Sequence, residues 1–332
     1  MEYRQFGRSS VKVSCLCLGC MNFGSRTSRD ESVRIIHESI EQGINFLDTA
    51  NIYSQGLSEE IVGEALAEGA RRDGVFLATK CTSRMGKGPN SSGSNRYHIM
   101  QQCEGSLRRL KSDHIDLYQM HQMDLDTALD ETLRALDDLV RQGKVVYTGT
   151  SKYAPPMLVE ALMLAERYGW SKFLSEQPPY NLLDRRIEDE LIWTCMRHGV
   201  GIIPWAPMAT GILSGQYSRG ASVPETSRAA HGGVPDVRLT PEAVVRTKRI
   251  AELAAEKGVT PAEYSLAWVL RRPGITAPIV GVRTMEHLHS ALSVIDIRFD
   301  DDELARIDEI APPGSYVSDY WEINVYRRLR PT

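Results

Sequence analysis

Short runs rich in Val, Ile, Leu and Cys alternate with stretches of helical periodicity along the chain, and this alternation limits the fold more than any other feature. It is typical of a parallel β-sheet whose strands are joined by helices. The count of runs then decides between the possible parallel-sheet folds. Eight runs are found, at 15–20, 44–48, 75–80, 115–121, 145–150, 173–177, 200–205 and 277–281.

The stretches between these runs begin with helix-start signals. Ser28 is followed three residues later by Glu31, and Thr240 and Thr260 are each followed by proline. In residues 29–42 the apolar positions share one stripe and the charged positions lie opposite, so this helix is expected to pack on a sheet. Strand and helix signals therefore support the same alternating pattern.

Eight parallel strands with covering helices close into a (β/α)8 barrel, which we predict as a single domain over residues 1–332. An open doubly wound sheet would normally carry G-x-G-x-x-G after a strand, and this chain has no such motif. Residues 2–6 and 11–14 flank GRSS and predict a hairpin that closes the barrel bottom, with a frayed terminus as the alternative. Long Gly-, Ser- and Pro-rich segments at 81–95 and 206–239 are expected to lie over the barrel mouth.

Composition restricts the partners and the location of the protein. The chain contains 39 Lys and Arg residues and 43 Asp and Glu residues, so its net charge is -4. It therefore lacks the excess of basic residues that is typical of nucleic-acid-binding proteins. No segment has the apolar length of a signal peptide or a membrane span, and the six cysteines are scattered. We therefore expect a cytoplasmic protein with free thiols and no nucleic-acid or membrane partner, whose oligomeric state is left open.

Polar residues stand where the predicted strands end, and in a barrel these positions face the mouth. Strand two ends at Asp48, with Tyr53 five residues later, strand three at Lys80 and strand four at His121. An ammonium group beside a phenol stabilises the phenolate, so we expect Lys80 to pull the pKa of Tyr53 toward neutrality while Asp48 keeps Lys80 charged and aimed. His121 would orient a carbonyl oxygen by a hydrogen bond or share the proton transfer. Any one of these four residues at such a position more often has a structural role than a catalytic one. Only their combination predicts a site that donates a proton to a carbonyl group.

Motifs carrying these residues occur with others in a fixed order. INFLDTANIYSQGLSEEIVGEAL, VFLATK and IDLYQMH are followed by GTSKYAP, EQPPYNLLDR, PWAPMATGILSGQY and PIVGVRT. Over nearly the whole chain the sequence resembles the aldo-keto reductases. The resemblance implies an oxidoreductase with a (β/α)8 barrel that binds NADPH in an extended pose. Tyr53 would be the general acid while hydride passes from the nicotinamide to an aldehyde or ketone.

The resemblance also implies which residues contact the cofactor. Asp48 would be one of them, in addition to its catalytic role. Ser151 and Gln177 would bond the nicotinamide carboxamide, and Trp205 would stack on the nicotinamide, although a core tryptophan is the alternative. The pyrophosphate would follow the backbone at Ala206, Met208, Gly211, Leu213 and Gly215. At the end of strand eight, an anionic group would bind at Gly281, Arg283 and Thr284. Arg283 would hold the 2′-phosphate and favour NADPH over NADH.

The chain departs from the family pattern at three positions. Lys152 stands where relatives usually have Asn, and His287 and Ala291 stand where Gln and Asn are expected. These changes do not affect the four catalytic residues. They leave undetermined which residues contact the nicotinamide carboxamide and the adenine. The substrate, a small-molecule carbonyl compound, would meet Met21, Phe23, Tyr53, Arg84, His121, Met123 and Trp205, with tail aromatics Tyr316, Tyr320 and Trp321 nearby.

Two other functions compete with general carbonyl reduction. The segment PNSSGSNR after strand three resembles the aldo-keto reductase branch that includes reductases of nucleotide-linked or unsaturated keto-sugars. A cofactor-binding regulatory subunit similar to potassium-channel β subunits is the second alternative. A metal site is not expected, because Cys15 and Cys17 share one face of a strand while Cys20 points to the other, and His287 and His289 diverge on a helix.

Overall fold

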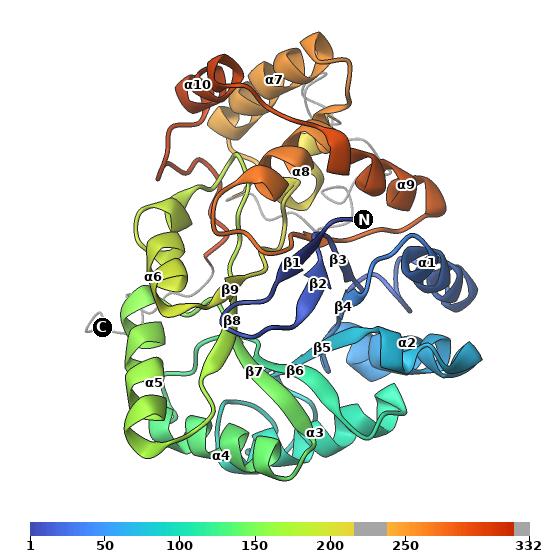
Figure 1. The fold of residues 1–332 in the computed structure, drawn as a ribbon, viewed down its shortest axis with the longest axis vertical. Coiled ribbons are helices and arrows are strands. Elements are labelled where there is room, and N and C mark those ends of the chain that lie inside the picture. Colours follow the sequence, from blue (N-terminus) through green and yellow to red (C-terminus); the bar gives the residue numbers. More distant parts are fainter. Residues whose placement is uncertain (216–237, 322–332) are drawn as a thin grey trace.

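The computed structural model describes residues 1–215 and 238–321, and its centre is a sheet of eight parallel strands (Figure 1). The strands lie in the order β10-β3-β4-β5-β6-β7-β8-β9. Each of them overlaps one of the apolar runs from which a parallel sheet was predicted. They are β3 (Cys17–Gly19), β4 (Phe46–Asp48), β5 (Phe76–Cys81), β6 (Ile115–Met120), β7 (Val145–Ser151), β8 (Phe173–Gln177), β9 (Gly201–Ile202) and β10 (Ile279–Val280).

The two ends of this sheet meet and close it into a ring. The amide of Thr276 donates to the carbonyl of Ile202 at 2.8 Å, and the amide of Ile279 donates to the carbonyl of Pro204 at 2.9 Å. Strands β9 and β10 are shorter than predicted because Pro204 and Pro278, which have no N–H, interrupt the regular ladder. The fold is therefore the (β/α)8 barrel that the alternating pattern predicts.

Helices surround the strands on the outside of the ring (Figure 1). Ser28, Thr240 and Thr260 cap the helices that they were predicted to start, each accepting a bond from a backbone amide three residues later. Among the described residues, no helix has the length and apolarity needed to cross a membrane. The helices are α1 (Arg29–Glu41), α2 (Leu57–Ala67), α3 (Arg96–Leu110), α4 (Leu129–Arg141), α5 (Pro155–Tyr168), α6 (Leu191–His198), α7 (Pro241–Glu256), α8 (Pro261–Arg271), α9 (Met285–Ser293) and α10 (Asp301–Ile310).

The predicted N-terminal hairpin forms from β1 (Tyr3–Gln5) and β2 (Lys12–Ser14), which pair antiparallel. It lies across the middle of the ring in Figure 1. The Phe6 ring, just after β1, lies 5.5 Å from the Phe46 ring and 5.4 Å from the Phe76 ring, measured between centroids. Phe46 and Phe76 begin β4 and β5, so the hairpin covers the end of the barrel opposite the strand C-termini.

Candidate active site

A buried ion pair lies at the C-terminal ends of neighbouring strands β4 and β5. Lys80 Nζ lies 2.5 Å from Asp48 Oδ1 and also donates to the backbone oxygen of Thr49 at 2.8 Å. The Lys80 side chain has no exposed surface, and that of Asp48 is 3% exposed. An ammonium group at this depth is stable because a carboxylate and a carbonyl replace its water.

The chain after β4 carries Tyr53 to this pair. The amide of Thr49 donates to the carbonyl of Ala78, and the amide of Asn51 donates to that of Lys80, which ties the segment to β5. Ser54 then adopts a left-handed conformation with φ of 49° and turns the chain toward α2. The Tyr53 hydroxyl consequently lies 3.3 Å from Lys80 Nζ. The structure brings together the phenol and the ammonium group that the sequence pattern pointed to.

Burial raises the pKa of Tyr53 above its usual value, and the positive charge of Lys80 does not cancel this effect. The expected shift toward neutrality is therefore wrong for the protein alone. The carboxylate of Asp48 explains part of the difference, because its negative charge lies against Lys80 and also raises the pKa of Tyr53. Tyr53 is a protonated phenol at neutral pH, which is the form that can donate a proton.

His121 follows β6, which is two strands from β4 in the sheet, and its ring faces the phenol of Tyr53. Its ring is perpendicular to the Tyr53 ring, with the centroids 5.6 Å apart. Burial lowers the pKa of His121 well below its usual value, and the charges of Lys80 and Lys152 lower it further. The neutral imidazole suits a hydrogen-bonding role toward a carbonyl oxygen better than storage of a proton.

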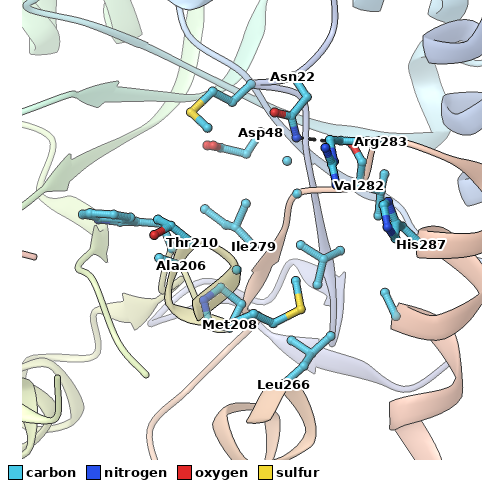
Figure 2. Close-up of a pocket in the computed structure, with 18 of the residues that line it drawn as sticks. Asn22, Asp48, Ala206, Met208, Thr210, Leu266, Ile279, Val282, Arg283 and His287 are labelled. Carbon is cyan, nitrogen blue, oxygen red and sulfur yellow. Dashed lines mark hydrogen bonds between the residues drawn. The ribbon is translucent and has the colours of Figure 1, made fainter. Parts of the chain in front are cut away.

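Asp48, Tyr53 and His121 line a cavity of about 520 Å³, a size typical of small-molecule sites. The cavity runs from Tyr53 and His121 across the barrel mouth to α8 and α9, and Figure 2 shows labelled residues on several of its sides. Lys80 lies beneath the wall rather than in it. Of the residues that sequence analysis assigned to the site, the lining includes Met21, Asp48, Tyr53, His121, Ser151, Gln177, Trp205, Ala206, Met208, Gly211, Gly281 and Arg283.

Polar side chains form a linked group beside Asp48. Gln177 Nε2 donates to Asp48 Oδ2 at 3.1 Å, and Ser151 Oγ donates to the backbone oxygen of Gln177 at 2.8 Å. Gln119, a residue that sequence analysis did not select, also donates to Asp48 Oδ2, at 3.0 Å. Gln119 stands two residues before His121 in the predicted strand 115–121. Because side chains alternate along a strand, this spacing was the signal that Gln119 faces the same side as His121, the inside of the barrel.

The cavity wall after β9 has an unusual backbone. Ala206, Ala209 and Thr210 have φ of 55°, 52° and 55°, and Gly211 has φ of 100°. A Cβ atom on Gly211 would meet nothing within 4 Å, so the backbone there faces open space. Left-handed residues in succession turn backbone N–H groups toward a common side and form concavities for anions. This segment fits a phosphate-bearing ligand.

Arg283 and His287 lie together at the other end of the cavity, beside α9 (Figure 2). Arg283 lines the cavity, and no described carboxylate forms an ion pair with it. Burial lowers the pKa of His287, and Arg283 lowers it further, so this imidazole is neutral. His287 and Ala291, two of the departures from the family pattern, both line the cavity.

The structure corrects part of the expected substrate wall. Phe23 is fully buried and Met123 is 9% exposed, since both side chains pack into the apolar core. Arg84 donates to Gly88 and Ser92 within its own loop and does not line the cavity. The segment 81–95 thus forms hydrogen bonds within itself, and none of its residues lines the cavity.

Some residues expected near the cofactor are also absent from the cavity wall. Leu213 is fully buried, Gly215 lies beyond the lining, and Thr284 caps α9 by accepting a bond from the His287 amide. Tyr320 is buried and packs edge-on against Trp205, with ring centroids 6.0 Å apart. Of the expected segment 206–239, residues 216–237 lie outside the described residues. Within the described part of the chain, no cluster of ligand-type side chains could hold a metal ion.

Comparison with known proteins decides the family. A model of the aldo/keto reductase family matches residues 15–312. The chain belongs to the aldo/keto reductase family. As an aldo/keto reductase it falls among proteins that typically use a nicotinamide cofactor, and its (β/α)8 barrel is the fold of that family.

Several relatives of this aldo/keto reductase carry oxidoreductase names. It is 39% identical to the uncharacterized oxidoreductase YrpG of Bacillus subtilis (strain 168), over 95% of this chain and 97% of the relative. It is 34% identical to a versiconal hemiacetal acetate reductase of Aspergillus parasiticus, over 93% and 96% of the two chains. It is also similar to a probable voltage-gated potassium channel subunit beta of Arabidopsis thaliana, at 32% identity over 90% and 92%. The family and the relatives together make this chain an oxidoreductase.

Proposed function

We propose that this protein reduces an aldehyde or ketone to the alcohol with NADPH, using Tyr53 as the general acid. The observation that carries the proposal is the Tyr53 hydroxyl at the end of a cavity, 3.3 Å from a buried ammonium group. A phenol in that place donates its proton to an alkoxide as the alkoxide forms. NADPH supplies the hydride when bound.

Each neighbour of Tyr53 contributes one physical effect. Lys80 stabilises the phenolate that remains after proton donation, because its charge lies beside the oxygen and cannot be screened by water. Asp48 keeps that ammonium group charged and fixed in direction. The neutral His121 donates a hydrogen bond to the carbonyl oxygen and holds it toward the phenol.

The remainder of the cavity fits the phosphate-rich cofactor by its chemistry. Ser151, Gln177 and Trp205 would hold the nicotinamide, and the left-handed backbone around Gly211 would receive the pyrophosphate. Arg283 would pair with the 2′-phosphate and give NADPH its advantage over NADH. A small-molecule carbonyl compound would occupy the space between His121 and Trp205. The six cysteines, which are free and buried, support a cytoplasmic location.

The decisive test compares the wild-type protein with Tyr53→Phe, using oxidation of NADPH by 4-nitrobenzaldehyde as the probe reaction. We expect kcat to fall by about 10²- to 10⁴-fold, the range for loss of a general acid, while NADPH affinity changes little. Tyr97→Phe is the matched control, because that phenol lies on α3 and is 64% exposed. A Tyr53→Phe protein with the wild-type rate would refute the mechanism.

A second candidate function is a cofactor-binding regulatory subunit, and the Arabidopsis thaliana relative named as a probable potassium channel subunit beta favours it. If the protein is such a subunit, the wild-type protein should bind NADPH. It should, however, reduce a panel of aldehydes and ketones no faster than the Tyr53→Phe variant does. Reduction of any carbonyl at a rate that depends on Tyr53 would exclude it as the sole function.

A further inference from the structure

Gln119 occupies a buried position that the proposed reaction does not use. It extends from β6 into the barrel and has no exposed surface. Its Nε2 donates to Asp48 Oδ2 at 3.0 Å, and its Oε1 accepts from Gln177 Nε2 at 3.1 Å. Because an ionised carboxylate only accepts hydrogen bonds, the nitrogen of Gln119 must face Asp48 and its oxygen must face Gln177.

The same contacts fix the orientation of the Gln177 amide. Gln177 Nε2 donates to both Asp48 Oδ2 and Gln119 Oε1, at 3.1 Å in each case. An amide nitrogen has two N–H groups, so both donors of Gln177 are used inside the barrel. The polar atom that remains for a ligand in the cavity is Oε1, which accepts no bond from the described residues. Gln177 therefore presents an acceptor to the cavity and no donor.

A glycine makes this contact between the two glutamines possible. Gln119 lies on β6 and Gln177 on β8, so the contact crosses β7, where Gly149 pairs in register with Gln119 on one side and Ser175 on the other. A Cβ atom on Gly149 would lie 2.4 Å from Ser175 Oγ and 3.2 Å from Gln119 Cγ. A side chain at this position would displace Gln119 and separate the two amides.

We propose that Gln119 is a positioning residue that locks the Gln177 amide with its oxygen toward the cofactor, and thereby selects a nicotinamide that carries an N–H donor. The inference rests on the proposed function, since it requires the nicotinamide to lie beside Gln177. The carboxamide of NADP⁺ offers an NH2 group to that oxygen, whereas an acetyl group in its place offers none. Without Gln119, one N–H of Gln177 loses its acceptor, and the amide is free to turn its nitrogen toward the cavity.

The test is discrimination between two cofactors that differ only in this substituent. Dissociation constants of NADP⁺ and 3-acetylpyridine adenine dinucleotide phosphate are measured by quenching of tryptophan fluorescence. We expect the wild-type protein to prefer NADP⁺ by about tenfold, and Gln119→Met to reduce the preference to about twofold. Gln177→Met should give the same loss, and the double variant should lose no more, because the two residues act as one unit. Gln101→Met, on the outer face of α3, is the matched control.

The outcomes separate this inference from the proposed function. A folded Gln119→Met protein with the wild-type preference overturns the positioning role and leaves carbonyl reduction intact. A wild-type protein without any preference overturns it too. If neither cofactor binds to the wild-type protein, the proposed function fails and the inference fails with it. Should Gln119→Met not fold, Gln119→Asn replaces it, because the shorter amide cannot reach Asp48 and Gln177 together.

Discussion

Lys80 and Asp48 form an ion pair of 2.5 Å between side chains that are 0% and 3% exposed. Taking two opposite charges out of water costs several kcal/mol for each ion, so such a pair is retained for what it does to its surroundings as much as for stability. Besides the backbone oxygen of Thr49, the pair contacts the Tyr53 hydroxyl and the amides of Gln119 and Gln177. The ion pair therefore fixes the position of the Tyr53 hydroxyl relative to the two glutamine amides.

Removing one partner of this pair should destabilise the fold. Lys80→Met leaves the Asp48 carboxylate buried with amide donors only, and we expect a loss of about 3 to 5 kcal/mol in the free energy of unfolding. Urea denaturation measures it, and the added substitution Asp48→Asn should restore part of the loss. The control is Arg134→Met, which breaks an exposed pair with Asp138 of 3.0 Å and should cost below about 1 kcal/mol. A loss of similar size in both variants would contradict the prediction.

The rate of carbonyl reduction should be nearly independent of pH in the neutral range. The pKa of Tyr53 lies above its usual value and that of His121 well below it, so the phenol stays protonated and the imidazole neutral between about pH 6 and about pH 9. The measurement is kcat/KM for an uncharged aldehyde at saturating NADPH. A bell-shaped profile centred near neutrality would show that one of the two groups titrates there.

Arg283→Ala should weaken binding of NADPH much more than binding of NADH. The guanidinium lies in the cavity wall without a described carboxylate partner, and a charge-assisted bond to a phosphate is worth about 1.5 to 3 kcal/mol, or roughly 10- to 150-fold in affinity. Fluorescence titration with both cofactors gives the two dissociation constants. Arg34→Ala, on the exposed side of α1, should change neither value. Equal losses for NADPH and NADH would remove Arg283 from the role of 2′-phosphate ligand.

Glu176 should make the fold less stable as pH rises. Burial raises its pKa from 4.5 to about 8, although Thr150 Oγ1 and the Tyr153 amide both donate to it. The unfolded chain releases this proton near pH 4.5 and the folded protein only near pH 8, so the folded state binds more protons between these values. Stability therefore falls by about 5 kcal/mol across this window and levels off above it.

Glu176→Gln removes the titrating group and supplies the comparison. Its free energy of unfolding, measured by urea denaturation at a series of pH values, should lack the decline between about pH 5 and about pH 8 that the wild-type protein shows. Parallel curves for the two proteins would mean that Glu176 remains ionised in the folded state throughout this range.

The barrel and the core of the site could be predicted because both depend on local order along the chain. Eight apolar runs separated by amphipathic stretches leave few alternatives to a closed parallel sheet. Parallel strands end on the same side, so Asp48, Lys80 and His121 had to meet at one mouth once the strands were located. Tyr53 could be added because it follows Asp48 by only five residues.

Loop residues were predicted less well, for a physical reason. Phe23, Met123 and Arg84 were expected in the substrate wall, yet two of them lie in the core and one bonds within its own loop. A loop side chain has no periodicity that fixes its direction, so its neighbours decide whether it faces the cavity or the interior. The tail aromatics illustrate the same point, since Tyr320 turns inward against Trp205.

The amino-acid sequence by itself determined the order of strands and helices, the closure of the barrel and the residue types that stand at its mouth, because these follow from periodicity and from the common direction of parallel strands. Only the tertiary structure decided that burial raises the pKa of Tyr53 despite Lys80, and that Gln119 reaches Gln177 over Gly149. Desolvation and contact between non-adjacent strands depend on the surroundings of a side chain in three dimensions, and no local pattern in the chain records them.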